Sequence, residues 1–90
     1  MTRKFKDHPY AQACVIENTN YKALQSYETI VIEIDNEGWL HVNGLYSPTT
    51  IRHIGWFMRE LGITYQLAKQ LYNDHKDFNI YTREVIDNDN

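Results

Sequence analysis

The residues of this chain best suited to chemistry gather between Thr49 and His53. Thr49, Thr50, Arg52 and His53 follow a Ser-Pro pair, which is typical of a helix start. The first turn of a helix offers free N–H groups and the positive end of the helix dipole, to which Arg52 adds a forked donor and His53 a titratable one. This pattern indicates a site for a phosphate or a partner's carboxylate. In the alternative, the threonines solvate the helix end, Arg52 pairs with a surface acid and a buried His53 donates to the backbone.

A second group of residues is suited to binding a protein. Trp56 has Arg52 and Arg59 one helical turn to either side, and Trp and Arg are the residues most enriched at the centres of interfaces. Trp39, with His41, marks a second candidate surface on the outward side of a hairpin. We therefore predict that Trp56, Arg52, Arg59 and Trp39 bind a partner. The alternative for Trp56 is partial burial against the hairpin or the C-terminal segment.

Catalysis, a metal and a cofactor have little support in the sequence. The histidines have neither HxH nor HxxxH spacing, and Cys14 stands alone. No GxSxG, P-loop or HExxH motif occurs. The acids in and beside the hairpin are typical of a solvated strand face: Glu28, Glu33, Asp35 and Glu37. We expect a protein that is not an enzyme, with no catalytic residue, metal site or cofactor.

The segment 57–71 has some features of a helix-turn-helix motif. Gly62 stands where the motif needs its turn glycine, and apolar residues follow at helical spacing. A DNA-reading helix normally carries several bases for phosphates, whereas here Lys69 is the one base near the start of the second helix. A nucleic-acid binder that uses Gln66, Lys69 and Arg52 therefore remains an alternative, beside two helices joined by an ordinary glycine turn.

The elements that must position these residues are a hairpin and two helices. Residues 27–34 and 39–43 alternate between apolar and polar side chains around a turn at 35–38, which predicts a hairpin over 27–43. Helical spacing and capping residues predict a helix at 48–61 and a second at 65–75. The stripe expected to face the sheet comprises Ile51, Ile54, Met58 and Leu61. The predicted fold class is α+β, a small antiparallel sheet of two or three strands packed against the first helix.

The remaining segments are less clearly defined. Residues 11–17 favour a first strand, 21–26 a short strand or one helical turn, and 78–86 a late strand or a helical extension. The predicted organisation has three parts: a flexible basic arm at 1–10, one α+β domain at 11–86 and an acidic tail at 87–90.

Length and charge limit the function classes. Ninety residues make one small domain of modest stability unless it self-associates. A net charge of −3 argues against a general nucleic-acid binder. A lone cysteine indicates a reducing compartment. Since the start lacks an apolar signal region and no apolar run reaches the length of a membrane span, we expect a cytoplasmic protein with no membrane partner.

Two stretches, SYETIVIEID and VNGLYSPTTIRHIGWFMRE, contain a spaced pattern, SYxTxV and then YSxTTxRHIxxF. Its residues are Ser26, Tyr27, Thr29, Val31, Tyr46, Ser47, Thr49, Thr50, Arg52, His53, Ile54 and Phe57. The pattern resembles an uncharacterised family of short proteins from phages and the bacteria they infect, and it covers about the middle third of the chain. The family has no agreed activity, so the resemblance implies a mobile-element origin and no catalytic residues.

We therefore expect a small non-enzymatic accessory protein of phage type in the cytoplasm of a host cell. By analogy with other small acidic phage proteins, it would occupy a host protein, and a host defence nucleic-acid enzyme inhibited in the manner of an anti-CRISPR target is the partner that this analogy suggests. The alternatives are a helix-turn-helix-like DNA-binding regulator and a structural accessory protein that forms a homo-oligomer.

Overall fold

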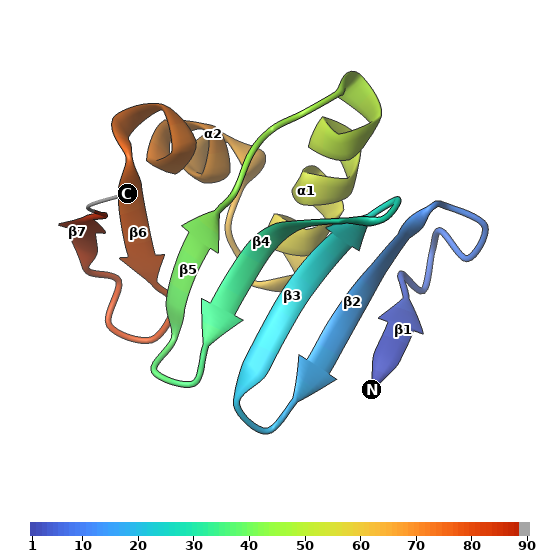
Figure 1. Ribbon diagram of the computed structural model, residues 1–90, viewed down its shortest axis with the longest axis horizontal. Coiled ribbons are helices and arrows are strands. Elements are labelled where there is room, and N and C mark those ends of the chain that lie inside the picture. Colours follow the sequence, from blue (N-terminus) through green and yellow to red (C-terminus); the bar gives the residue numbers. More distant parts are fainter. Residues whose placement is uncertain (89–90) are drawn as a thin grey trace.

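The computed structural model describes residues 1–88, whose strands form one antiparallel sheet (Figure 1). Its seven strands are neighbours in the order in which they occur in the chain. Their bounds are β1 Thr2–Lys4, β2 Ala13–Asn18, β3 Tyr21–Ser26, β4 Thr29–Asp35, β5 Trp39–Val42, β6 Lys76–Asn79 and β7 Val85–Asp87. Each strand thus pairs with the strand before it, and β6 returns to the edge of β5 after the helices.

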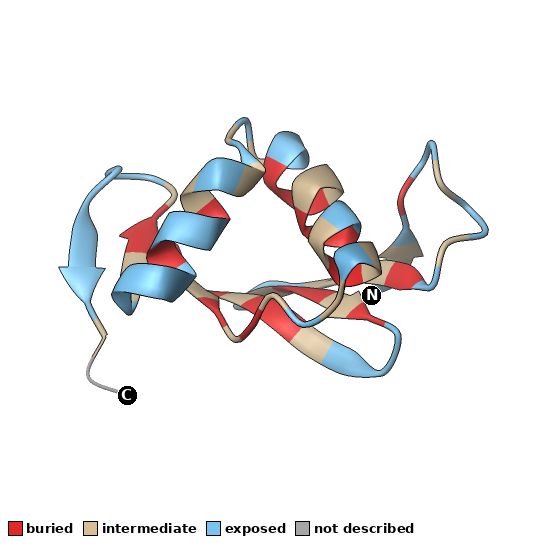
Figure 2. Cartoon of the chain, turned by 90° about the horizontal axis from the view of Figure 1, so that it is seen from above, coloured by how far each residue is buried: buried red, intermediate tan, exposed pale blue. Residues whose placement is uncertain are grey.

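Two helices follow β5, α1 (Pro48–Glu60) and α2 (Tyr65–Asp74). Both lie on the same side of the sheet, so within residues 1–88 the other side carries no helix (Figure 2). The molecule therefore has two layers, and each strand presents one set of alternate side chains to the helices and the other set to the open side.

The core lies between the sheet and the helices. Val15, Leu24, Ile32 and Val42 are opposite one another on four successive strands and are nearly or fully buried. On the side of the sheet that carries the helices, α1 contributes three residues at helical spacing to the core. Ile54, Phe57 and Met58 have no exposed surface. Full burial of one such side chain stabilises the fold by roughly 1.5–3 kcal/mol. This interlayer packing fixes which side of α1 points to solvent.

The hairpin of β4 and β5 turns at Gly38. Its φ of 94° lies in the left-handed region, which favours glycine. The Asp35 side chain accepts hydrogen bonds from the N–H groups of Glu37 and Trp39, at 2.9 and 3.0 Å. A Cβ at Gly38 would also lie 2.5 Å from the ring of Tyr81. Both backbone conformation and space therefore require glycine here.

The start and end of α1 follow from local sequence. Ser47 is the N-cap, its side chain accepts from the N–H of Thr50 at 3.2 Å, and Pro48 occupies the first turn. Leu61 caps the other end, and Gly62 follows with a φ of 77°. These residues hold α1 in the register that its buried stripe requires.

The predicted sheet of two or three strands is wrong, since the sheet has seven. The hairpin and both helices lie within two residues of their predicted bounds. However, residues 21–26, which favoured either a strand or a helical turn, form β3 because β2 and β4 pair along its whole length. Residues 78–86 are neither one strand nor a helix. The Asn79 side-chain oxygen accepts from the N–H groups of Tyr81 and Thr82, which turns the chain between β6 and β7.

The segment expected to be a flexible arm, residues 1–10, contributes a strand to the sheet. Its β1 pairs with β2, and Phe5 is 3% exposed. The Arg3 guanidinium bridges Glu17 and Glu60, at 2.6 and 2.7 Å, and so joins β1 and β2 to α1. Of the predicted acidic tail, 87–90, Asp87 ends β7, while residues 89–90 lie outside the described part of the chain.

Candidate functional site

A buried polar cluster joins the end of β3 to the first turns of α1. Ser26 Oγ lies 2.8 Å from His53 Nδ1 and 3.0 Å from Thr50 Oγ1. Thr50 Oγ1 also accepts a hydrogen bond from Ser47 Oγ at 3.2 Å. Ser26, Thr50 and His53 are 2–4% exposed. Because an unpaired polar group is costly to bury, this mutual pairing fixes α1 against the sheet.

The environment of His53 favours its neutral form. Burial lowers the pKa of the imidazole below its ordinary value of 6.5. The positive charges of Arg52, His8 and Lys4 lower it further. His53 is thus a buried residue whose protonation is disfavoured mainly by burial, and adding a proton to it would oppose folding.

The structure divides the predicted anion site, Thr49, Thr50, Arg52 and His53. Thr50 and His53 face inward and are hydrogen-bonded to Ser26. Thr49 is half-buried, and Arg52 is exposed on the outer side of α1. The four residues therefore share a helix end without converging on one point.

Trp56 is the centre of an aromatic cluster and does not stand free on the surface. The ring of His8 lies flat on the indole, with centroids 3.6 Å apart and planes 5° apart. Phe5 meets the indole edge-on at 5.7 Å, and His53 lies 5.1 Å away. Tyr27 extends the cluster to the end of β3, with its ring 5.9 Å from that of His53. The indole is half-buried and held from several sides.

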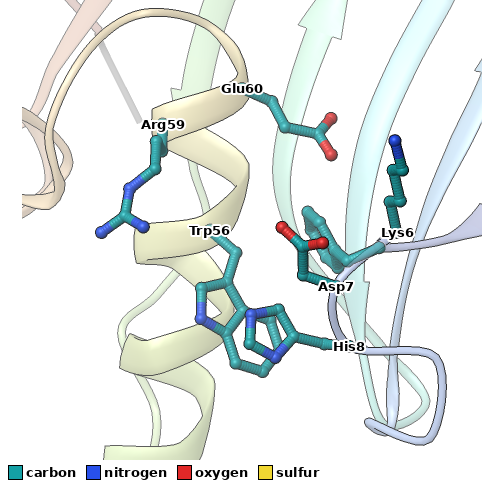
Figure 3. Close-up of a pocket in the computed structure, with 7 residues that line it drawn as sticks. Lys6, Asp7, His8, Trp56, Arg59 and Glu60 are labelled. Carbon is teal, nitrogen blue, oxygen red and sulfur yellow. The ribbon is translucent and has the colours of Figure 1, made fainter.

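A cleft of about 160 Å³ lies between the β1–β2 loop and α1 (Figure 3). Its lining residues are Phe5, Lys6, Asp7, His8, Trp56, Arg59 and Glu60. Glu60 extends from α1 toward the loop, whereas Arg59 leaves the helix on its other flank (Figure 3). Since Arg3 already holds Glu60, Asp7 is the acid of the cleft that forms no salt bridge within residues 1–88.

The outer side of α1 is basic. Arg52 and Arg59 are both exposed, and neither forms a salt bridge with another residue of the described chain. They are seven residues apart, so a rise of 1.5 Å per residue places them about 10 Å apart along the same side of the helix. Two guanidinium groups that form no ion pair with another residue of the described chain attract a negatively charged surface.

The fourth predicted binding residue, Trp39, lies on the opposite side of the molecule. Leu40 and Val42 of β5 face the helices, so the alternation of the strand directs Trp39 and His41 to the open side of the sheet. There His41 Nδ1 pairs with Asp77 at 2.7 Å. Trp39 therefore cannot act on the same contact surface as Trp56, Arg52 and Arg59.

The same open side carries a second polar network, around Glu33. The hydroxyl of Tyr21 donates to the Glu33 carboxylate at 3.0 Å, and so does the amide of Asn43. Burial, followed by this hydrogen bond, raises the pKa of Tyr21 to about 12. Each carboxylate oxygen of Glu33 has its own donor, which explains how the acid is tolerated on a half-buried strand.

The helix expected to read DNA, α2, presents a mixed surface. Its exposed residues line a shallow depression: Gln66, Lys69, Gln70, Asn73 and Asp74. One cation and one acid there give no net positive charge, and Arg52 belongs to the other helix. Across residues 1–88, no three residues among His, Cys, Asp and Glu are grouped so that they could hold a metal, and neither helix is long and apolar enough to cross a membrane.

Sequence reasoning missed the contribution of the first ten residues. Phe5 and His8 enclose Trp56, although they precede it by about fifty positions. It also missed Ser26 as the partner of His53. No local periodicity connects these residues, and the one available signal was that Ser26 and His53 occur in the same spaced pattern.

Comparison with known proteins places the chain in a family. Residues 3–79 match the model of a family of unknown function, DUF8033, and the chain belongs to that family. No curated protein and no solved structure matches it. The matched range begins within β1 and includes the loop over Trp56, both helices and β6.

Proposed function

We propose that this member of a family of unknown function is a non-enzymatic binding protein that docks on a partner protein through the outer side of α1. One observation carries the proposal. Arg52 and Arg59 are exposed and form no salt bridge within residues 1–88, while Trp56 is fixed between them by Phe5 and His8. Two free guanidinium groups beside a rigid indole are the side chains most often found at the centres of interfaces.

The cluster around Trp56 reduces the cost of binding. An aromatic side chain that is already held by its neighbours loses little conformational freedom when a partner arrives. The arginines gain most when a partner's carboxylates replace water, because bidentate charge-assisted hydrogen bonds are the strongest that side chains form. The docking surface therefore comprises Arg52, Arg59, the edge of Trp56 and the loop that carries His8.

We further propose that the chain is a phage-type accessory protein of the host cytoplasm, and that its partner is a host nucleic-acid enzyme of defence, which it inhibits in the manner of an anti-CRISPR protein. The resemblance of the SYxTxV and YSxTTxRHIxxF patterns to phage proteins supports this origin. The small size of the chain and its basic docking surface fit a protein that works by occupying another protein.

The test is affinity capture from a host lysate with matched charge variants. The wild-type protein, the double variant Arg52→Glu/Arg59→Glu and the control Lys69→Glu on α2 are compared, and the proteins retained are quantified by mass spectrometry. We expect a protein that the wild type and the control retain equally and that the double variant loses at least tenfold. Arg52 and Arg59 are preferred to Trp56 as targets, because Trp56→Ala would also remove the contacts with Phe5 and His8.

Equal retention by all three proteins would reject the docking surface. The DNA-binding alternative is tested separately by titrating the wild type with DNA at falling salt concentration, since phosphate contacts strengthen as salt is removed. Light scattering over a range of concentrations tests the self-associating alternative.

A further inference from the structure

Gly55 is a glycine that the fold of the described chain does not require. It lies in the middle of α1, where glycine is less favourable than alanine. A Cβ at Gly55 would meet no heavy atom within 4 Å, in contrast to the 2.5 Å contact that a Cβ would make at Gly38. Its φ is also not in the left-handed region. Neither space nor backbone conformation explains this residue.

The position of Gly55 on the helix connects it with the docking surface. Arg52, Gly55, Trp56 and Arg59 have the spacing i, i+3, i+4 and i+7, which places them along one side of α1. The buried residues of α1 occupy the opposite side. Gly55 thus leaves the helix backbone uncovered between the two arginines, and a second chain can approach it more closely than it could approach a larger side chain.

The separation of the two arginines along α1 favours a helix over a strand as the partner segment that binds both. Residues seven apart on a partner helix lie about 10 Å apart on one side, as Arg52 and Arg59 do. Side chains on one face of a strand recur about every 7 Å, so the nearest separations of about 7 and about 13 Å differ from this spacing by about 3 Å, a gap that the arginine side chains would have to close. An acidic helix with carboxylates seven residues apart matches both arginines at once.

We propose that Gly55 forms the floor of a groove in which an acidic helix of a protein partner packs along α1, with one carboxylate on Arg52 and another on Arg59. This inference rests on the proposed function and specifies the partner's chemistry. Small residues of the partner helix would lie over Gly55, because a large side chain there would keep the carboxylates from reaching the guanidinium groups.

The probe is a labelled helical peptide of 21 residues with glutamates seven apart on one side, an alanine midway between them and polar neutral residues elsewhere. A control peptide has the same composition, with its glutamates distributed around the helix. Binding is measured by fluorescence anisotropy for the wild type, Gly55→Ala, Gly55→Leu, Arg52→Gln, Arg59→Gln and the control Lys69→Gln, and thermal unfolding is measured for each protein.

We expect the wild type to prefer the one-sided peptide at least fivefold over the control peptide. Gly55→Leu should weaken binding at least tenfold and Gly55→Ala about threefold, although the melting temperature of both rises by a few degrees because glycine is replaced in a helix. Binding lost in a protein that has become more stable cannot be attributed to misfolding. Each arginine variant should weaken binding at least threefold, and Lys69→Gln should not change it.

Three results would overturn the inference. If Gly55→Leu binds the peptide as the wild type does while the arginine variants do not, the groove is rejected and the docking surface stands. If no arginine variant weakens either peptide binding or lysate capture, the proposed function fails as well. If the wild type ignores the one-sided peptide, or binds an oligothymidylate of equal charge more tightly, the acidic helix is the wrong occupant.

Discussion

His53 shows how one buried side chain can make stability depend on pH. Burial and the cations Arg52, His8 and Lys4 lower its pKa in the folded protein, whereas in the unfolded chain it titrates near 6.5. Below pH 6.5 the unfolded chain therefore binds a proton that the folded protein resists. The stability that neutral His53 contributes is fully present above pH 6.5 and is lost as the pH falls through the lower pKa of the folded state.

The prediction is that the free energy of unfolding decreases as the pH is lowered from 7.5 to 5.5, and that His53→Gln makes this decrease smaller. Urea denaturation at intervals of half a pH unit measures the free energy of unfolding for the wild type and the variant. Hydrogen bonds to Arg3 and Lys76 lower the pKa values of Glu17 and Asp87 below the ordinary carboxylate range, so these acids stay ionised in this interval. An unchanged slope in the variant would show that His53 is not the group responsible.

Some of the individual contacts of α1 could be predicted from the sequence. Ser47 was expected as the N-cap of the first helix and is one, because a cap depends on residues within one turn. The sequence is compatible with a buried His53, but it indicates a hydrogen bond from His53 to the backbone. The actual partner, Ser26, is 27 positions away, and only the packing of β3 under α1 brings the two together.

At the scale of elements, Phe5 is the most deeply buried side chain of β1 and the loop after it. Phe5 is 3% exposed, packs in the core and touches the indole of Trp56. The neighbouring contacts, such as the Arg3 bridges to Glu17 and Glu60, are partly exposed and contribute less because water screens them.

We therefore predict that Phe5→Ala lowers the stability of the whole protein by about 3 kcal/mol, in the range found when a buried phenylalanine is truncated. Tyr10→Ala, in the same segment, should change it by less than about 0.5 kcal/mol, because Tyr10 is 96% exposed. Chemical denaturation of both variants provides the measurement. If Phe5→Ala and Tyr10→Ala changed the free energy of unfolding equally, the first ten residues would behave as a flexible arm.

The elements that were predicted least well are those whose identity depends on their neighbours. The hairpin over 27–43 was found because alternation and a glycine turn are local signals. Residues 21–26 carry no such signal. They become β3 because β2 and β4 supply hydrogen-bonding partners on both sides. Three residues are too few for a strand to be recognised by its pattern, so β1 and β7 could not be predicted either.

At the scale of the whole molecule, sheet and helices share one core. All the buried apolar residues of the described chain except Ala23 form one cluster that extends from Phe5 to Phe78. Because the strands are neighbours in chain order, most pairing is between adjacent segments, and the helices close the sheet from one side. A domain of this size with one core is expected to unfold as one unit.

The two tryptophans allow this to be tested, since Trp39 reports on β5 and the open side of the sheet and Trp56 on α1 and the loop. Trp39→Phe leaves Trp56 as the single fluorescent reporter, and Trp56→Phe leaves Trp39. We predict that, in each variant, fluorescence and circular dichroism give the same urea midpoint of unfolding. Midpoints that differ within one variant would show that the loop and α1 unfold separately from the sheet.

The sequence by itself determined what depends on short-range physics: the hairpin at Gly38, the start of α1 at Ser47 and Pro48, and the outward direction of Arg52 and Arg59. Of the stripe expected to face the sheet, Ile54 and Met58 are buried, whereas Ile51 and Leu61 are only half-buried and Phe57 is buried in addition. Tertiary structure alone decided the number of strands, the burial of Phe5, the stacking of His8 on Trp56 and the separation of Trp39 from the other predicted binding residues. The physical reason is that turns, caps and periodicity involve groups within a few residues of one another. Strand pairing and stacking join distant segments, and no local preference specifies which of them meet.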